Sequence, residues 1–108
     1  MTAERRESCR YRFELEVEEM RSNVRARTRD ISLTGMYVRG LPARLLTRIS
    51  LSVRFPDIEV PLAVTADVVR VERGGKDVAL KLVHPVLAAQ LNFEAQLRQL
   101  ASAKTQVD

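Results

Sequence analysis

Hydrophobic and polar residues alternate along most of the chain, which is the pattern of β-strands with one buried face. The first run, "RFELEVEE" at residues 12–19, is followed by a turn at Ser22 and Asn23 and by a second alternating run at residues 24–29. Together they predict a β-hairpin. The residues predicted to face inward are Phe13, Leu15, Val17, Val24, Ala26 and Thr28.

The central part of the chain predicts further strands. Two short apolar stretches flank residues 32–35, and "LPARLLTR" at residues 41–48 fits either a single helical turn or a loop. The clearest strand signal is "ISLSVRF" at residues 49–55, where alternate residues are apolar. Two more strands are expected at residues 58–72, where Pro61 indicates a bend or an edge, and at residues 77–83 after a Gly74-Gly75 turn.

The period of the pattern changes after His84 and Pro85, where apolar residues recur three or four positions apart. This spacing predicts one amphipathic helix with Val86, Ala89, Phe93, Leu97 and Leu100 on one face. That face is most simply part of the core, or else a contact surface for a partner. Six strands joined by tight turns close most simply into a small barrel. The predicted fold is therefore all-β with a terminal helix: a six-stranded antiparallel β-barrel plus a C-terminal α-helix. Residues 1–103 are expected to form a single domain and residues 104–108 a frayed tail.

Composition narrows the functional classes. The 108 residues include 18 basic and 14 acidic ones, and only three of the basic residues are lysine. Arginine binds phosphate with two parallel donors and stacks on bases, so a phosphate or nucleotide partner is expected. With one histidine and one cysteine, the chain lacks the parts of a usual zinc site or a histidine-based triad. We therefore expect no enzymatic activity, no metal and no cofactor.

No apolar stretch approaches the roughly 18 residues that a membrane-spanning helix requires. The first ten residues also contain no apolar run of the kind found in signal peptides. A cytoplasmic location and no membrane span are the expectations.

Two short segments carry the candidate chemistry. The segment "ERRESCRYR", residues 4–12, contains four arginines, of which Arg6 and Arg10 are four apart and Arg5 is adjacent. The segment "DISLTG", residues 30–35, follows the second predicted strand. In an antiparallel hairpin the start of one strand lies beside the end of the other, so Arg10 is expected near Asp30 despite twenty intervening positions.

The residue types of these segments suit a guanine nucleotide. Arginines supply phosphate contacts and planar groups that stack on bases. A carboxylate such as Asp30 accepts two parallel hydrogen bonds from N1–H and the 2-amino group of guanine. Ser32 offers a hydroxyl, and Gly35 indicates either a positive φ or a close approach to the backbone. Asp30 and Ser32 are also residues that commonly stabilise turns, a second role that is compatible with ligand binding.

Arg-x-x-x-Arg followed by Asp-x-Ser-x-x-Gly, on this strand pattern, resembles the PilZ domain family of bacterial cyclic di-GMP receptors. The resemblance implies a barrel ending in a helix, with Arg6 and Arg10 gripping phosphate and guanine. It also implies that Asp30 and Ser32 contact base and phosphate, with Gly35 at the turn. The remaining candidate ligand contacts are Arg5 as an accessory, Arg39, and Arg70, which is the nearest candidate for a base-stacking position.

The function implied by the resemblance is that of a non-enzymatic receptor or adaptor. Binding of cyclic di-GMP would order the arginine segment for a protein partner, plausibly in motility, surface polysaccharide or adhesion. One alternative is a basic barrel that binds single-stranded nucleic acid, although aromatic residues make up only 5% of the chain and specific nucleic acid recognition is not expected. Another alternative is a scaffold of this fold that binds no ligand.

Overall fold

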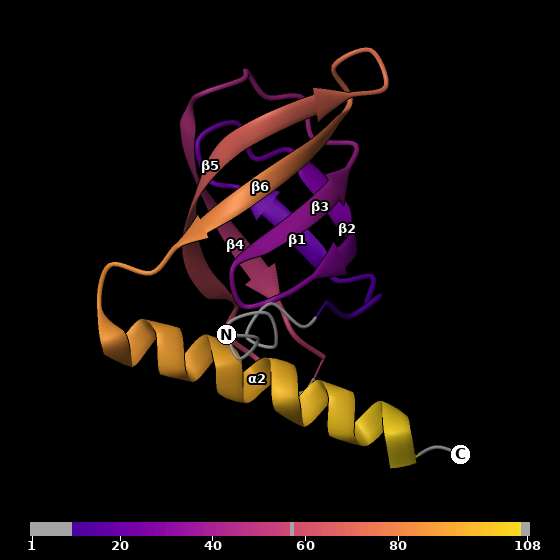
Figure 1. Ribbon diagram of the computed structural model, residues 1–108, viewed down its shortest axis with the longest axis vertical. Helices are drawn as coiled ribbons and strands as arrows, with labels where there is room; N and C mark the ends of the chain where they lie inside the picture. The colour runs from indigo at the N-terminus through magenta and orange to yellow at the C-terminus, as the bar shows by residue number, and fades with distance from the viewer. Residues whose placement is uncertain (1–9, 57, 107–108) are drawn as a thin grey trace, which may run out of the picture.

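The computed structural model describes residues 10–56 and 58–106, with the backbone alone for residues 103–106. It contains six strands followed by a helix, and the predicted fold class is confirmed (Figure 1). The elements are β1 (Glu16–Glu19), β2 (Arg25–Ile31), β3 (Gly35–Arg39), β4 (Arg48–Arg54), β5 (Leu62–Glu72), β6 (Asp77–Val83) and α2 (Leu87–Gln106).

The strands form a closed barrel in the order β1-β2-β3-β6-β5-β4, and β1 pairs with β4 to complete it. All neighbouring strands are antiparallel. Closure gives every strand two partners, so the sheet has no unpaired edge. The interior is filled by apolar side chains from all six strands, including Val17, Ala26, Ile31, Met36, Val38, Leu51, Val53, Ala66, Val68, Val78 and Leu80.

The first strand is shorter than its sequence pattern predicts. Phe13 and Leu15 are buried as expected, but regular pairing begins only at Glu16. Between them, the Thr28 hydroxyl accepts a hydrogen bond from the Leu15 N–H at 2.8 Å and donates one to the Phe13 carbonyl at 2.6 Å. A side chain of β2 therefore replaces one backbone partner and holds the segment before β1 against the barrel.

Irregularities in β2 and β5 shift the alternation of inward and outward residues. The register of β2 against β3 shifts between Thr28 and Asp30, and that of β5 against β6 shifts between Val68 and Arg70. A bulge inserts one extra residue, so the residues after it swap faces. Ile31 consequently enters the core while Asp30 stays outside, and Arg70 lies outside although it is two residues after the buried Val68.

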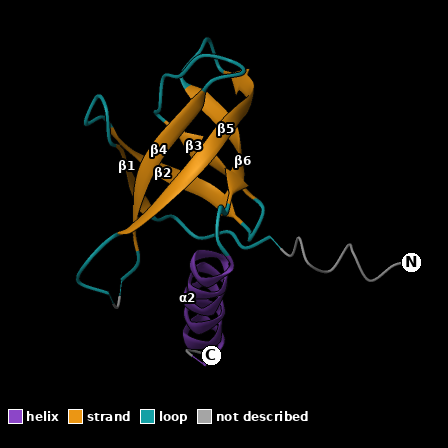
Figure 2. Ribbon diagram, turned by 90° about the vertical axis from the view of Figure 1, so that its left-hand side faces the viewer, coloured by secondary structure: helices purple, strands orange, loops and turns teal. Residues whose placement is uncertain are grey.

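The helix α2 runs across one end of the barrel (Figures 1 and 2). Phe93 is 1% exposed and packs edge-on against Phe55, with ring centroids 5.9 Å apart. The other helical residues of the core are Leu97 and Leu100.

Two residues of the predicted apolar helix face are exposed, so the interpretation of that face as core was wrong for them. Val86 precedes the helix and is 58% exposed, and Ala89 is also exposed. The connection from β6 carries the first turn of α2 to one side of the barrel, as Figure 1 shows, and Ala89 lines an open cleft there instead of packing into the core. The helix continues to Gln106, so residues 104–106 of the expected frayed tail have helical backbone.

The connections agree with most of the predicted turns. Residues 41–47 form a loop rather than a helical turn, and β5 begins directly after Pro61. Gly74 and Gly75 make the β5–β6 turn with φ values of 67° and 88°, which lie in the left-handed region that favours glycine. Within residues 10–56 and 58–106, no helix combines the length and apolar character needed to cross a membrane.

Candidate functional site

The two sequence segments singled out above meet on the outside of the barrel. Tyr11 and Ile31 exchange backbone hydrogen bonds of 2.8 and 2.9 Å, which fixes the segment before β1 alongside the end of β2. This bridge brings Arg10 to Asp30, and Arg10 Nη1 lies 2.5 Å from Asp30 Oδ1. The predicted proximity of the two residues is confirmed.

Asp30 is held by two arginines at once. Arg10 donates to Oδ1, and Arg29 Nε donates to Oδ2 at 2.9 Å. The Asp30 side chain is only 9% exposed, whereas those of Arg10 and Arg29 are about half exposed. Burial alone raises the pKa of Asp30, but the hydrogen bonds and positive charges of Arg29 and Arg10 outweigh it, so the pKa lies below its ordinary value. The carboxylate is therefore ionised at neutral pH.

A chain of contacts continues from Asp30 across the outer face. The Arg29 guanidinium carbon lies 3.8 Å from the centre of the Tyr37 ring, which is a cation–π contact. The Tyr37 hydroxyl donates to Glu72 Oε1 at 2.8 Å, and Arg70 Nε donates to Glu72 Oε2 at 2.5 Å. The network thus links three arginines through two carboxylates and one aromatic ring.

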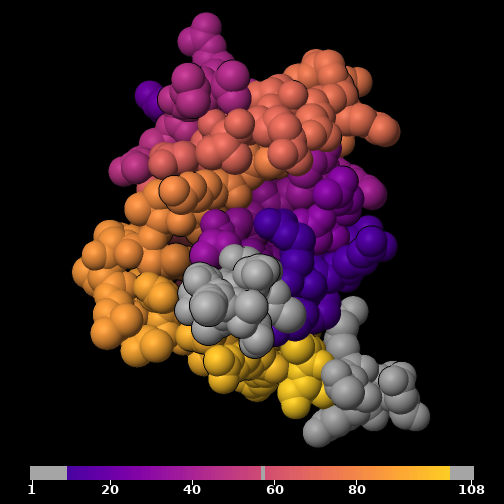
Figure 3. All heavy atoms as spheres, in the orientation of Figure 1, coloured from indigo at the N-terminus to yellow at the C-terminus, as the bar shows by residue number. Residues whose placement is uncertain are grey.

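Strand register explains why these residues adjoin. Asp30 pairs with Tyr37, Tyr37 with Ala79, and Ala79 with Arg70, so one row crosses β2, β3, β6 and β5. The small Ala79 side chain in this row is compatible with Tyr37 reaching across β6 to Glu72. In Figure 3 the surfaces of the N-terminal strands (indigo and purple) and of β6 (orange) adjoin on the face turned to the viewer.

Ser32 stabilises the turn between β2 and β3. It is fully buried, its hydroxyl accepts hydrogen bonds from the N–H groups of Thr34 and Gly35, and it donates to the Gly35 carbonyl. The turn is also tied to the β6–α2 connection, because His84 Nε2 donates to the Leu33 carbonyl at 2.7 Å. In the structure Ser32 therefore has the turn-stabilising role that the sequence indicated beside ligand contact.

Gly35 is required by close backbone approach. A Cβ at this position would lie 2.9 Å from the Leu80 carbonyl oxygen and 3.6 Å from Arg10 Nη2. The sequence left two reasons open for a glycine at this position, a positive φ or a close approach to the backbone. Gly35 is not among the glycines with positive φ, which are Gly40, Gly74 and Gly75. Steric room, both for β6 and for Arg10, is the reason for glycine.

The remaining predicted site residues are distributed as follows. Arg5 and Arg6 lie outside the described residues. Arg70 belongs to the network, whereas Arg39 lies at the other end of β3 from Gly35, paired with Arg27 and Asp77. The structure therefore brings Arg10, Asp30, Gly35 and Arg70 to one region but leaves Arg39 apart from it.

Sequence reasoning missed Arg29, Tyr37 and Glu72. In the alternating run at residues 24–29, Arg29 occupies a position predicted to face solvent, and nothing in the alternation indicates the bulge that directs it toward Asp30. The adjacency of Arg29 to Asp30 was the available signal. Tyr37 and Glu72 are 35 residues apart, and only the strand order places them together.

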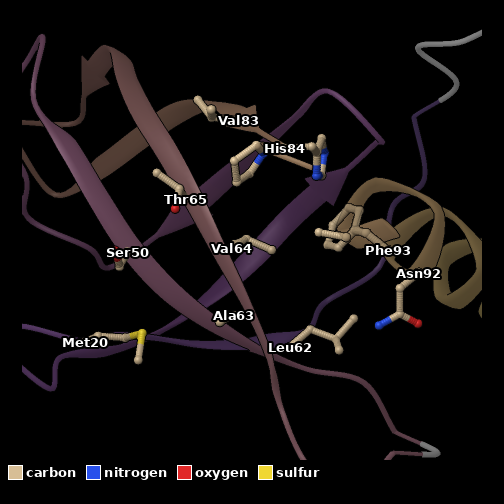
Figure 4. Close-up of a pocket in the computed structure, with 12 residues that line it drawn as sticks. Met20, Ser50, Leu62, Ala63, Val64, Thr65, Val83, His84, Asn92 and Phe93 are labelled. Carbon is tan, nitrogen blue, oxygen red and sulfur yellow. The ribbon is translucent and has the colours of Figure 1, made fainter. Parts of the chain in front are cut away.

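A cleft of about 200 Å³ lies elsewhere, between β4, β5 and the start of α2 (Figure 4). Leu62 and Val64 line it from β5, and Asn92 and Phe93 from α2. Its lining contains no Asp, Glu, Lys or Arg, so it is unsuited to an anionic ligand. Among the residues that the structure describes, no three or more His, Cys, Asp or Glu side chains are grouped so as to hold a metal ion.

Comparison with known proteins supplies the family context. The family model described as "PilZ domain" matches residues 3–103, which is most of the chain. No curated protein matches the chain.

Several solved structures share the fold. The Bacillus subtilis inhibitor of motility, MotI/DgrA, is 21% identical with a TM-score of 0.69, over 91% of this chain and 52% of that one. YcgR from Escherichia coli in complex with c-di-GMP is 14% identical with a TM-score of 0.75, over 94% and 48%. The separate PilZ domain of YcgR with c-di-GMP is 15% identical with a TM-score of 0.65, over 94% and 98%. The chain thus spans about half the length of MotI/DgrA and of whole YcgR, and nearly all of the YcgR domain.

Proposed function

The chain belongs to the PilZ domain family, and we propose that it is a non-enzymatic receptor for cyclic di-GMP that binds the dinucleotide at the Arg10–Asp30 site. In this proposal Arg10 and, from outside the described residues, Arg5 and Arg6 contact phosphates and bases. Asp30 accepts hydrogen bonds from guanine. Ser32 shapes the turn that presents Asp30, and Gly35 leaves room for the Leu80 carbonyl of β6 and for Arg10.

The observation that carries the proposal is the ion pair between Arg10 and Asp30. It joins the last arginine of Arg-x-x-x-Arg to the first residue of Asp-x-Ser-x-x-Gly, twenty positions later. Because Asp30 is nearly buried while Arg10 is half exposed, the arginine is the accessible partner. A ligand that offers phosphate to Arg10 and a guanine edge to Asp30 replaces this pair with two separate interactions of the same chemistry.

The charge of the network supports an anionic ligand. Three arginines, Arg10, Arg29 and Arg70, are linked to two carboxylates, Asp30 and Glu72. The hydrogen bonds from Tyr37 and Arg70 hold the pKa of Glu72 below its ordinary value, so both carboxylates are ionised at neutral pH. One positive charge is left over, before Arg5 and Arg6 are counted. A doubly charged cyclic dinucleotide suits that excess.

Signalling is proposed to follow from capture of the arginine segment. Ligand phosphates would hold residues 5–10 against the face of β2 and β3, creating a surface that a partner protein recognises. YcgR, whose structure contains c-di-GMP, has this fold, and so does an inhibitor of motility. By analogy, a partner in motility, surface polysaccharide synthesis or adhesion is proposed here.

Calorimetric titration with cyclic di-GMP tests the function. We expect the wild-type protein to bind at micromolar concentration, with affinity reduced at least about tenfold by Arg6→Ala, Arg10→Ala or Asp30→Asn, since each removes a charge-assisted contact. Arg25→Ala is the matched control, because Arg25 lies on β2 and pairs only loosely, at 3.9 Å, with Glu16 and Glu18. The proposal would be refuted if the wild-type protein did not bind, or if all three site variants bound as tightly as wild type.

The nucleic acid alternative is less well supported by the structure. Binding of single strands uses exposed aromatic rings on which bases stack, but Phe13, Phe55 and Phe93 are buried and Tyr37 is covered by Arg29. A gel-shift assay with single-stranded oligonucleotides at low and high salt distinguishes the two functions. Tight, salt-sensitive retardation that cyclic di-GMP does not compete away would favour the alternative.

A further inference from the structure

Arg29 presents an immobilised flat surface next to the proposed ligand site. One face of its guanidinium lies on the Tyr37 ring at 3.8 Å, and its Nε–H is bonded to Asp30 Oδ2 at 2.9 Å. The Arg29 side chain is nevertheless 46% exposed. Since Tyr37 covers one face of the guanidinium, a base can approach this group only from the opposite face or the edges.

The support beneath Arg29 is itself fixed. Tyr37 is only 4% exposed, and its hydroxyl is bonded to Glu72, which is also held by Arg70. Arg29 is the bulged residue of β2, so it lies outside the barrel together with Asp30 instead of alternating with it. The same backbone irregularity thus determines the positions of both the Arg29 guanidinium and the Asp30 carboxylate.

Arg70 is a less favourable platform than Arg29. It is 60% exposed, and its bond is to Glu72, a residue 39% exposed. The one cation–π contact identified in the described part of the chain is that of Arg29. An arginine backed by a ring loses less conformational freedom when a base stacks on it, and this makes stacking more favourable.

We propose that Arg29, backed by Tyr37, is a stacking platform for a guanine base of the ligand, so that base, guanidinium and tyrosine ring form a three-layer stack beside Asp30. The inference rests on the proposed function, because it concerns the same ligand. It assigns the stacking position to Arg29, where the sequence had favoured Arg70. Asp30 then accepts hydrogen bonds from the edge of a guanine base, while Arg29 stacks on the face of a base.

Conservative substitutions separate planarity from charge. Arg29→Lys keeps the positive charge beside Asp30 but removes the flat group, and we expect cyclic di-GMP affinity to fall roughly tenfold by calorimetry, the scale of one base stack. Tyr37→Leu should weaken binding because the plane loses its backing. Tyr37→Phe retains the ring and should bind within about twofold of wild type. Arg25→Lys, on the same strand but bonded elsewhere, is the matched control and should bind as wild type does.

A spectroscopic signature distinguishes stacking from a purely structural role. The Arg29 Nε–H proton is protected by its bond to Asp30, and its NMR signal can be assigned by its loss in Arg29→Lys. Ring current from a stacked guanine should move this signal upfield on addition of cyclic di-GMP. If the wild-type protein binds but this signal does not move and Arg29→Lys binds as tightly as Arg25→Lys, the platform is refuted while the receptor function stands. If the wild-type protein does not bind, both are refuted.

Discussion

Asp30 and Tyr37 are paired across β2 and β3 on the outer face of the barrel, although Asp30 lies only two residues after the inward-facing Thr28. The bulge at Arg29 is what allows this, because it reverses the alternation and sends Ile31 into the core. The site and the hydrophobic core therefore depend on the same irregularity.

Asp30→Asn is expected to destabilise the fold in a pH-dependent way. The folded-state pKa of Asp30 is lowered, so its ion pairs stabilise the protein above its ordinary pKa of 3.8, and this is lost as pH falls through the lowered value. At neutral pH we expect the variant to lose about 1–2 kcal/mol of unfolding free energy. Urea denaturation at a series of pH values should show that the difference in unfolding free energy between the variant and wild type shrinks in acid. A difference that does not change with pH would contradict the role given to the Asp30 ion pairs. Asp67→Asn, at the more exposed Arg48 pair, should lose less unfolding free energy than Asp30→Asn.

Thr28→Val tests the side-chain link between β2 and the segment before β1. The substitution keeps the shape of the side chain but removes the buried hydroxyl that bonds to the Leu15 N–H and the Phe13 carbonyl, at an expected loss of about 2 kcal/mol. Thr28→Ser retains the hydroxyl and should lose no more than about 1 kcal/mol. Chemical denaturation of both variants measures the difference. Equal losses would mean that the methyl group, not the hydroxyl, matters at this position.

Gly35→Ala tests the close approach of β3 to β6. The new Cβ would lie 2.9 Å from the Leu80 carbonyl oxygen, and a backbone atom cannot move aside cheaply. We expect a loss of about 2 kcal/mol, in the range of overpacking changes, measurable as a lower thermal midpoint. Gly74→Asn is the control, because that position has open space and asparagine tolerates its positive φ. If Gly35→Ala melts like wild type, the strands separate more easily than the structure indicates.

Phe93→Ala and Leu91→Ala together test how the helix packs on the barrel. Phe93 is buried against Phe55, so its truncation should cost about 3–4 kcal/mol. Leu91 is 53% exposed, and its truncation should change stability by less than about 0.5 kcal/mol. Denaturation curves followed by circular dichroism report both values. A large effect of Leu91→Ala would show that the exposed helix face is covered in solution.

Much of the fold was predictable from local pattern. Alternation located the strands that supply Val17, Ala26, Leu51 and Val53 to the core, because a half-buried strand must repeat every two residues. The helix was also predictable, but its buried face was not fully so. Periodicity indicates which residues share a helical face, but it does not indicate how far along that face the close packing extends. Val86 and Ala89 were therefore assigned to the core although they are exposed.

The sequence by itself determined the strand pattern, the helix, the arginine-rich charge and the two motifs, since these depend on residue type and spacing along the chain. It also sufficed to place Arg10 beside Asp30, because a hairpin relates its two strands by a simple register. Only the tertiary structure decided that Arg29 is aimed at Asp30 and stacked on Tyr37, and that Glu72 anchors this ring. Those contacts depend on two bulges and on the order β2-β3-β6-β5, and both are set by how the barrel closes around its core.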